Sequence, residues 1–330
     1  MATPPRERIA ITCSSDEKYA RHSTTMLVSA VRNTPDADIA IYYMHGPDLA
    51  ESEQALIRQS LSRFGSRVSL KFCLVPDAWV EGLPLFSGMT PGSIRPVMWY
   101  RAFLPRLVPE EPKILYLDSD MIVLDDLRKL WSTDIAGKPL AAVTNPFFTN
   151  NKYYDWPLEL GLSDRGQYFN TGLMLLNLDY FREHGLLDRV LEHGRASAGF
   201  IRFGDQDTFS VLFHKDRVHL SPRWNLMRTI MLAPLSRELF TWPVLQDAIR
   251  HPGVVHFEGA FKPWINPARH PFGRQYTKYA KDLPWPVPSP AWSLDDLEAL
   301  LLRRMWYRAY DRVKRLRQHL KLKPKGNNGH

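Results

Sequence analysis

Cysteine is scarce in this sequence, and long apolar runs are missing. Only Cys13 and Cys73 are present, sixty residues apart in strand-like segments. This spacing argues against a disulfide framework or a cysteine-rich metal site, so we interpret both as small buried hydrophobic residues. No run of about 18 apolar residues is available to cross a membrane. The N-terminal residues also lack the apolar core of a signal peptide, so we expect a cytoplasmic protein.

Excess basic charge is confined to one end of the chain. The net charge is +8, but residues 301–330 alone contain ten lysines and arginines against one acid, Asp311. The rest of the chain has 33 basic and 34 acidic residues. The body of the protein is therefore close to neutral, and no nucleic-acid partner is expected.

The C-terminal segment, residues 293–330, has the pattern of a basic amphipathic helical tail with a disordered end. A stiff proline-rich linker at 281–292 precedes it. The apolar positions with mostly helical spacing are Leu297, Leu301, Met305, Val313, Leu316 and Leu320. Such a helix is typical of a segment that lies on an anionic membrane surface. A terminal helix packed on the body, with a solvated charged face, has the same pattern.

Strand-like and helix-like segments alternate along the body of the chain. Strands are expected at 8–15, 37–46, 68–76 and 139–147, and helices at 23–32, 48–64, 96–107 and 186–198. Strands that alternate with helices of this length predict right-handed βαβ units in a parallel sheet. We therefore expect an α/β fold with one domain over residues 1–280.

Residues 112–126, PKILYLDSDMIVLDD, form the most informative segment. An apolar strand leads directly into Asp118 and Asp120, and open α/β sheets bind ligands at the carboxyl ends of their strands. Two carboxylates at that edge suit Mg²⁺ or Mn²⁺ that bridges the phosphates of a nucleotide. Sugar-nucleotide transferases, aspartyl-phosphate phosphatases and nucleotidyl transferases all use such a motif. A solvated turn is an equally simple explanation for the motif alone.

Five ordered motifs together resemble glycosyltransferase family 8, particularly the bacterial lipopolysaccharide α-galactosyl and α-glucosyl transferases. They are SSDEKYA at 14–20, YLDSD at 116–120, YFNTGLMLLNL at 168–178, GDQD at 204–207 and HFEGAFKPW at 256–264. The resemblance covers about residues 8–265. It implies a GT-A type, Rossmann-like nucleotide-sugar-binding domain with a mixed, mainly parallel sheet.

The resemblance also implies a metal site and a nucleotide site. Asp118, Asp120 and His256 would hold Mn²⁺, with Mg²⁺ as a substitute, because a mixed oxygen and nitrogen set favours manganese. For the nucleotide, the resemblance implies that Asp16 and Tyr19 hold the uracil and that Gly259 and Lys262 hold the diphosphate. Without the family pattern, we would expect a core histidine, a helix-capping Asp16 and a surface lysine.

The donor sugar is implied to lie among side chains from distant motifs. The matching positions are Arg101, Ser119, Asn145, Asn170, Asp205 and Gln206, with Asp205 and Gln206 as the catalytic pair. Asn145 departs from the family pattern, because galactosyltransferase members carry an aspartate there. Loss of that carboxylate removes a strong acceptor for sugar hydroxyls, so galactose, glucose and an N-acetylated sugar all stay open.

The implied reaction is the metal-dependent transfer of a hexose from a UDP-sugar to a glycan or glycolipid hydroxyl, with retention of configuration. Because the amide of Gln206 is a poor nucleophile, we favour attack on the face from which the diphosphate leaves. Synthesis of lipopolysaccharide or a related surface glycan at the inner face of the membrane is the expected process. The alternatives are an Mg²⁺-dependent phosphatase and a nonenzymatic membrane- or RNA-binding protein.

Overall fold

The computed structural model describes most of the body of the chain. The described residues are 6–84, 96–147, 153–232, 236–259, 262–267 and 270–286. The predicted linker at 281–292 lies partly outside them, and the predicted tail at 293–330 lies wholly outside them. Within the described residues, no helix has the length and apolar character needed to span a membrane.

The N-terminal part forms the predicted alternation of strands and helices. It comprises β1 (Glu7–Ser15), α1 (Ala20–Asn33), β2 (Ala37–His45), α2 (Glu51–Ser62) and β3 (Val68–Leu74). β1 pairs in parallel with β2, and β2 pairs in parallel with β3. These elements follow the local periodicity of the sequence, since each is a nearly continuous apolar run or an apolar stripe.

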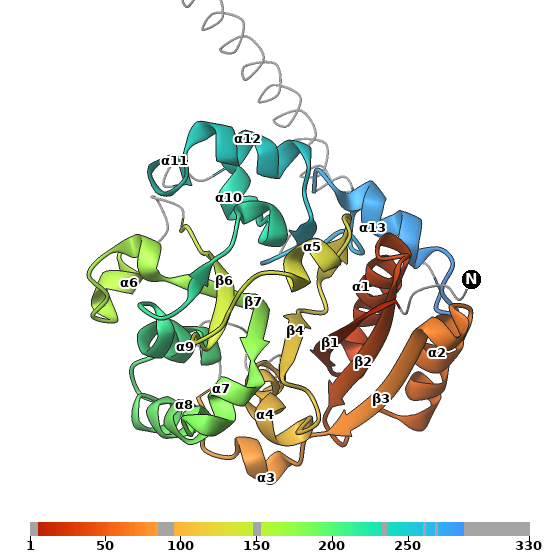
Figure 1. The fold of residues 1–330 in the computed structure, drawn as a ribbon, viewed down its shortest axis with the longest axis horizontal. Coiled ribbons are helices and arrows are strands. Elements are labelled where there is room, and N and C mark those ends of the chain that lie inside the picture. The colour runs from red at the N-terminus through yellow and green to blue at the C-terminus, as the bar shows by residue number, and fades with distance from the viewer. Residues whose placement is uncertain are drawn as a thin grey trace, which may run out of the picture.

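One seven-stranded sheet organises the molecule, with the order β3-β2-β1-β4-β7-β6-β8 (Figure 1). Its second half contains β4 (Lys113–Leu117), β6 (Leu140–Thr144), β7 (Phe169–Asn177) and β8 (Val218–His219). β7 runs antiparallel to both of its neighbours, whereas β1 with β4 and β6 with β8 are parallel pairs. The sheet is therefore mixed and mainly parallel, as expected.

A separate two-stranded ribbon lies beside the large sheet. β5 (Met121–Val123) pairs antiparallel with β9 (Val254–His256), and Met121 is opposite His256. This pairing joins parts of the chain that are more than a hundred residues apart. It brings the segment after β9 to the carboxyl end of β4.

The segment after Pro96 differs from its expected form. It is mainly a 3-10 helix, η3 (Pro96–Phe103), followed by one turn of α-helix, α4 (Leu104–Leu107). Trp99, Tyr100 and Phe103 are all buried. Every residue from Trp99 to Leu104 is buried, so this segment is enclosed on all sides, whereas an amphipathic α-helix buries a single stripe.

The remaining helices are mostly short and surround the sheet (Figure 1). They are α3 (Asp77–Val80), α5 (Arg128–Trp131), α6 (Trp156–Glu159), α7 (Leu178–Glu183), α8 (Leu186–Ala196), α9 (Asp205–Phe213), α10 (Arg228–Leu232), α11 (Ser236–Leu239), α12 (Trp242–Arg250) and α13 (Gly273–Ala280). α8 matches the helix predicted at 186–198.

Two hydrophobic clusters lie on the two faces of the sheet. Ile9 and Ile11 of β1 belong to one cluster, and Ala10 belongs to the other, because alternate strand residues point to opposite faces. Cys13 and Cys73 are buried free thiols, which confirms their interpretation. With both faces covered, polar side chains gather where the strands end, and the site lies there.

Candidate active site

The Asp118–Asp120 turn is anchored on both sides. The backbone N–H of Asp118 donates to the Gly172 carbonyl at 2.7 Å, which ties the end of β4 to β7. The Ser119 hydroxyl donates to the Ser14 carbonyl at 2.7 Å, which ties the turn to the end of β1. Ser119 is therefore buried and serves at least as an anchor of this turn.

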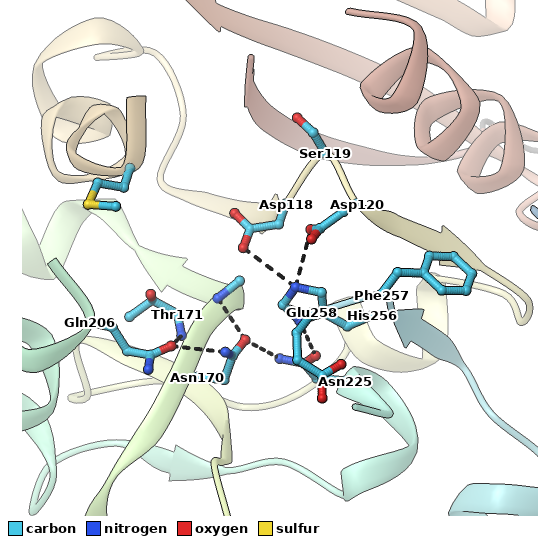
Figure 2. A network of polar contacts seen from close by, with 12 residues as sticks. Asp118, Ser119, Asp120, Asn170, Thr171, Gln206, Asn225, His256, Phe257 and Glu258 are labelled. Atoms are coloured by element: carbon cyan, nitrogen blue, oxygen red, sulfur yellow. Dashed lines mark hydrogen bonds and ion pairs between the residues drawn. The ribbon is translucent and has the colours of Figure 1, made fainter. Parts of the chain in front are cut away.

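His256 faces both carboxylates because β9 pairs with β5. The backbone N–H of Phe257 donates to the Asp120 carbonyl at 2.9 Å, which continues this pairing. His256 Nε2 lies 3.2 Å from Asp120 Oδ1 and 3.8 Å from Asp118 Oδ2 (Figure 2). One ligand atom from each of the three residues lies within 4.8 Å of the others. Among the described residues, this is the one group of three such side chains close enough to hold a metal ion.

The donor chemistry of this set fits a divalent cation. The two carboxylates provide hard oxygen atoms, which suit Mg²⁺ and Mn²⁺, and the imidazole nitrogen favours Mn²⁺ of the two. Burial opposes ionisation of Asp120, but the charges of Lys262 and His256 prevail and lower the pKa of Asp120. Burial likewise opposes protonation of His256, yet Asp120 and Asp118 raise the pKa of its imidazole. Asp120 is therefore held in its ionised form, as a ligand of a cation must be.

Gly172 allows the metal-ligating side chains to approach β7. A Cβ atom at this position would lie 2.5 Å from Asp118 Oδ2, 2.7 Å from His256 Cε1 and 2.8 Å from Asn170 Oδ1. These contacts are far shorter than van der Waals separation. The glycine of the FNTG motif is therefore required by the close packing of these three side chains.

Arg101 lies between the buried carboxylate of Asp205 and the partly buried carboxylate of Asp118. Its guanidinium contacts Asp118 Oδ1 at 2.8 Å and Asp205 Oδ2 at 3.2 Å, and it stacks over the Tyr116 ring. Tyr116 also donates its hydroxyl to Asp118 Oδ1 at 2.8 Å. Burial raises the pKa of Asp205 to about 6, because one guanidinium is shared with Asp118 and compensates only part of the cost.

Gln206, at the start of α9, is joined to the metal set through amides. Asn170 Nδ2 donates to Gln206 Oε1 at 2.9 Å, and Asn225 Nδ2 donates to Asn170 Oδ1 at 2.8 Å. Asn225 Oδ1 in turn lies 3.0 Å from His256 Nδ1 (Figure 2). The structure thus brings Asn170 and Gln206 together within one network that includes His256.

The residues predicted to hold the uracil lie beyond β1. Asp16 caps the 3-10 helix η1 (Glu17–Tyr19), since its Oδ1 accepts from the Tyr19 N–H at 3.0 Å. The ring of Tyr19 meets Trp264 edge to face, at 5.7 Å between centroids. His22 stacks on the same tryptophan, and burial lowers the pKa of His22 to about 3. This aromatic cluster joins η1 to the segment that contains Lys262.

Lys262 contacts the metal set directly. Its Nζ lies 2.5 Å from Asp120 Oδ2 and 2.7 Å from the Phe257 carbonyl. Gly259, between Phe257 and Lys262, has a φ of 72°, in the region where side chains are disfavoured. Asn145, directly after β6, is buried, and its backbone N–H donates to the Tyr168 carbonyl at 3.0 Å.

Three residues of the network were not singled out from the sequence. Tyr116 and Gly172 stand inside quoted motifs, but their roles depend on close packing that no local pattern reveals. Asn225, in the segment PRWN, belongs to no motif that we recognised. Nothing in its sequence context distinguishes it from an asparagine in a surface turn.

Comparisons with known proteins agree with this geometry. A family model, Glycosyl transferase family 8, matches residues 10–268. General stress protein A of Bacillus subtilis (strain 168) is 28% identical over 285 residues, which are 84% of this chain and 95% of that protein. Probable galacturonosyltransferase-like 6 of Arabidopsis thaliana is 27% identical, over 80% of this chain and 76% of that protein.

A solved structure is similar over nearly its whole length. The crystal structure of the galactosyltransferase LgtC in complex with donor and acceptor sugar analogues superimposes with a TM-score of 0.72 at 25% sequence identity. The match covers 85% of this chain and 98% of that chain. The α/β, GT-A-like fold expected from the sequence is therefore confirmed.

The chain belongs to glycosyl transferase family 8, because the family model spans most of its length. It is a glycosyltransferase, and this decides between glycosyl transfer and the phosphatase or nonenzymatic alternatives that the sequence left open. Proteins with this fold in this family generally use a divalent metal ion, and Asp118, Asp120 and His256 form a possible site for one.

Proposed function

We propose that the protein is a retaining, metal-dependent glycosyltransferase that transfers galactose or glucose from a UDP-sugar to a hydroxyl of a glycan or glycolipid. The observation that carries this proposal is the meeting of Asp118, Asp120 and His256 at the carboxyl end of β4, with Lys262 beside them. The similarity to LgtC, solved with donor and acceptor sugar analogues, supports a sugar donor and a sugar acceptor.

The proposed donor site follows the arrangement of the charged groups. Mn²⁺, or Mg²⁺ in its place, would neutralise charge on the leaving diphosphate when bound to the two carboxylates and the imidazole. Lys262 would donate to diphosphate oxygens from the other side, and the open backbone at Gly259 would approach them closely. Asp16 and Tyr19 would hold the uracil, with the Tyr19 ring available for stacking.

The proposed sugar site is formed by Asn170 and Gln206, together with Arg101 and Asn145. Gln206 is partly exposed, whereas Asp205 is 3% exposed and accepts from Thr171. Asp205 would therefore act by holding Arg101 and Thr171 in place beside Gln206. Because an amide is a poor nucleophile, attack of the acceptor on the face of diphosphate departure is the favoured route to retention.

The proposed cellular setting is the cytoplasmic face of the cell membrane, in lipopolysaccharide or surface-glycan synthesis. Support for it comes from the basic amphipathic pattern at 293–330 alone. Cosedimentation of the full chain with anionic and neutral vesicles tests this setting. Binding to anionic vesicles that weakens with salt supports the proposal, and equal sedimentation with both vesicles, or with neither, contradicts it.

Calorimetric titration of UDP-galactose and UDP-glucose into the purified protein tests the proposed reaction, first with Mn²⁺ and then with EDTA. We expect metal-dependent binding of at least one sugar nucleotide, and loss of that binding in Asp120→Asn. Asp125→Asn is a matched control, because Asp125 pairs with Arg223 and Lys129 after β5, outside the metal set. Binding unaffected by EDTA, or the absence of binding by either donor, would contradict the proposal.

A further inference from the structure

Asn225 is a fully buried side chain to which the proposed function gives no role. It is the last residue of the 3-10 helix η5 (Pro222–Asn225). The next residue, Leu226, accepts from the His256 N–H at 3.1 Å and donates its own N–H to the Val254 carbonyl at 2.9 Å. These two backbone bonds hold Asn225 beside His256 on one side and Asn170 on the other (Figure 2).

A backbone N–H determines which way the amide groups of Asn170 and Asn225 point. The Gly172 N–H, which only donates, lies 3.0 Å from one side-chain atom of Asn170, so that atom is the oxygen. The same oxygen lies 2.8 Å from Asn225, which must therefore present its NH₂ group there. The oxygen of Asn225 is then directed at His256 Nδ1, 3.0 Å away.

The amide oxygen of Asn225 determines which nitrogen of His256 carries a proton. An amide oxygen only accepts, so Nδ1 of His256 must carry the hydrogen. In a neutral imidazole the lone pair is then on Nε2. Nε2 is the atom that faces Asp120 at 3.2 Å and Asp118 at 3.8 Å. This tautomer presents a lone pair to the position between the two carboxylates. The carboxylates also only accept and favour a hydrogen on Nε2, so the amide of Asn225 opposes them unless a cation lies between them.

The same network orients Gln206. Its Oε1 accepts from Asn170 Nδ2 at 2.9 Å and from the Thr171 backbone N–H at 3.3 Å, so the assignment of its oxygen again rests on a backbone donor. Its Nε2 then donates to the Tyr168 hydroxyl at 3.0 Å. The Tyr168 hydroxyl donates to Asp207 Oδ1 at 2.5 Å. These contacts orient the amides of Gln206, Asn170 and Asn225 in one consistent chain between Asp207 and His256.

From this geometry we infer that Asn225 is a positioning residue: it holds His256 in the tautomer that a metal ion requires, and it couples that ligand to the amides of Asn170 and Gln206. The inference rests on the proposed metal-dependent function. Groups that orient metal ligands in this way typically change metal affinity about 10- to 100-fold when removed.

Two substitutions separate the two bonds of Asn225. Asn225→Leu removes both bonds and keeps the number and branching of the side-chain heavy atoms. Asn225→Asp keeps an acceptor for His256 Nδ1. It places a second oxygen against Asn170 Oδ1, so the hydrogen bond to Asn170, which leads on to Gln206, is lost. We therefore expect metal affinity to fall about 10- to 100-fold in Asn225→Leu and to be rescued in Asn225→Asp. Donor binding is expected to be weakened in both variants.

Asn33→Leu is a matched control for the loss of an asparagine with several bonds. Asn33 Nδ2 donates to the carbonyls of Ser29 and Val123 and to the Tyr279 hydroxyl, apart from the metal set. We expect this variant to lose stability and to keep the metal affinity of the unmodified protein.

The decisive experiment measures the imidazole nitrogens of ¹⁵N-histidine-labelled, metal-free protein by NMR, at a pH above the titration range of imidazole. His256→Gln identifies the His256 signals, and Mn²⁺ titration followed by electron paramagnetic resonance gives the metal affinity. We expect a protonated Nδ1 and an unprotonated Nε2 in the unmodified protein and in Asn225→Asp, and a mixture of tautomers in Asn225→Leu.

Two results would overturn the inference: a protonated Nε2 in the unmodified protein, or unchanged metal affinity and tautomer in Asn225→Leu. A third result separates it from the proposed function. If Nδ1 is protonated but the unmodified protein binds no Mn²⁺ or Mg²⁺, the tautomer assignment holds. The proposed metal-dependent function and the metal role of Asn225 then both fail.

Discussion

Asp118 and Asp120 stand one residue apart, but the two sides of the site neutralise them in different ways. Asp118 faces Arg101, which also donates to the carbonyls of Met98 and Thr171 and contacts Asp205. Asp120 faces Lys262, whose described partners are that carboxylate and the Phe257 carbonyl. The Arg101 side chain is 5% exposed, and the Lys262 side chain is 13% exposed.

The difference separates a structural cation from an exchangeable one. Arg101 has nearly all of its donors bound to protein groups of the sheet edge, so it cannot leave Asp118 without several losses. Lys262 extends from the segment after β9 and occupies the same carboxylate that a metal ion would use. A metal ion bound at Asp120 would therefore compete with Lys262, and a displaced ammonium would be free to bind an anion.

Stability measurements on two variants test this comparison most strongly. Arg101→Leu leaves the buried Asp205 and the partly buried Asp118 without their shared cation, and the loss of one partner of a buried pair typically costs about 3–5 kcal/mol. Lys262→Met leaves the charge of His256 beside Asp120, so we expect a smaller cost, about 2 kcal/mol. Urea unfolding of both variants and the unmodified protein, without metal, gives the two values. Equal losses of unfolding free energy in the two variants would show that Arg101 and Lys262 are both structural cations.

The pH dependence of stability sharpens the comparison on the Arg101 side. The pKa of Asp205 is about 6 in the folded protein, against an ordinary value of 3.8. The Asp205 carboxylate binds a proton more tightly in the folded protein than in the unfolded protein. The folded protein therefore loses stability as the pH rises from about 4 to about 6, and the loss is complete above that range. For this one group the loss is about 3 kcal/mol.

Asp205→Asn isolates this contribution, because the amide does not titrate. We expect the free energy of unfolding of the unmodified protein, minus that of the variant, to fall by about 3 kcal/mol between pH 4 and pH 6. Urea unfolding at several pH values measures this difference. Parallel curves for the two proteins would mean that Asp205 is ionised throughout, fully compensated by Arg101.

Local pattern was sufficient for the N-terminal strands and helices. In β1, α1 and β2 the apolar residues follow one period over a whole element, and the structure places these elements close to the predicted residues. The antiparallel insertion of β7 and the pairing of β5 with β9 were not predicted. Such pairings depend on which distant strands meet and in what register, and local periodicity does not contain that information.

The candidate site divides in the same way. Asp118 and Asp120 follow a strand within one motif, so their position was evident from local sequence. His256 was assigned only through family resemblance, because a histidine after two valines is ordinary in a core. Asn225 and Gly172 act through contacts with side chains from other elements, so their roles emerge only when the chain is folded.

The smallest expected effect is a change in ligand affinity in Lys262→Met. It tests directly whether a metal ion can replace Lys262 at Asp120. If Lys262 competes with a metal ion for Asp120, its loss raises Mn²⁺ affinity, and we expect about a tenfold gain, equal to about 1.4 kcal/mol. The same change removes a cation from the proposed diphosphate site, so UDP affinity in the presence of Mn²⁺ is expected to fall by about the same factor.

Effects of opposite sign on two ligands cannot arise from general damage to the site. Lys129→Met is a suitable control, since Lys129 pairs with Asp125 outside the metal set and should alter neither affinity. Titration calorimetry with Mn²⁺, and then with UDP at saturating Mn²⁺, measures both. A loss of Mn²⁺ affinity in Lys262→Met would show that Lys262 helps to hold Asp120 in place for the metal ion. Lys262 would then be a structural cation, as Arg101 is for Asp118.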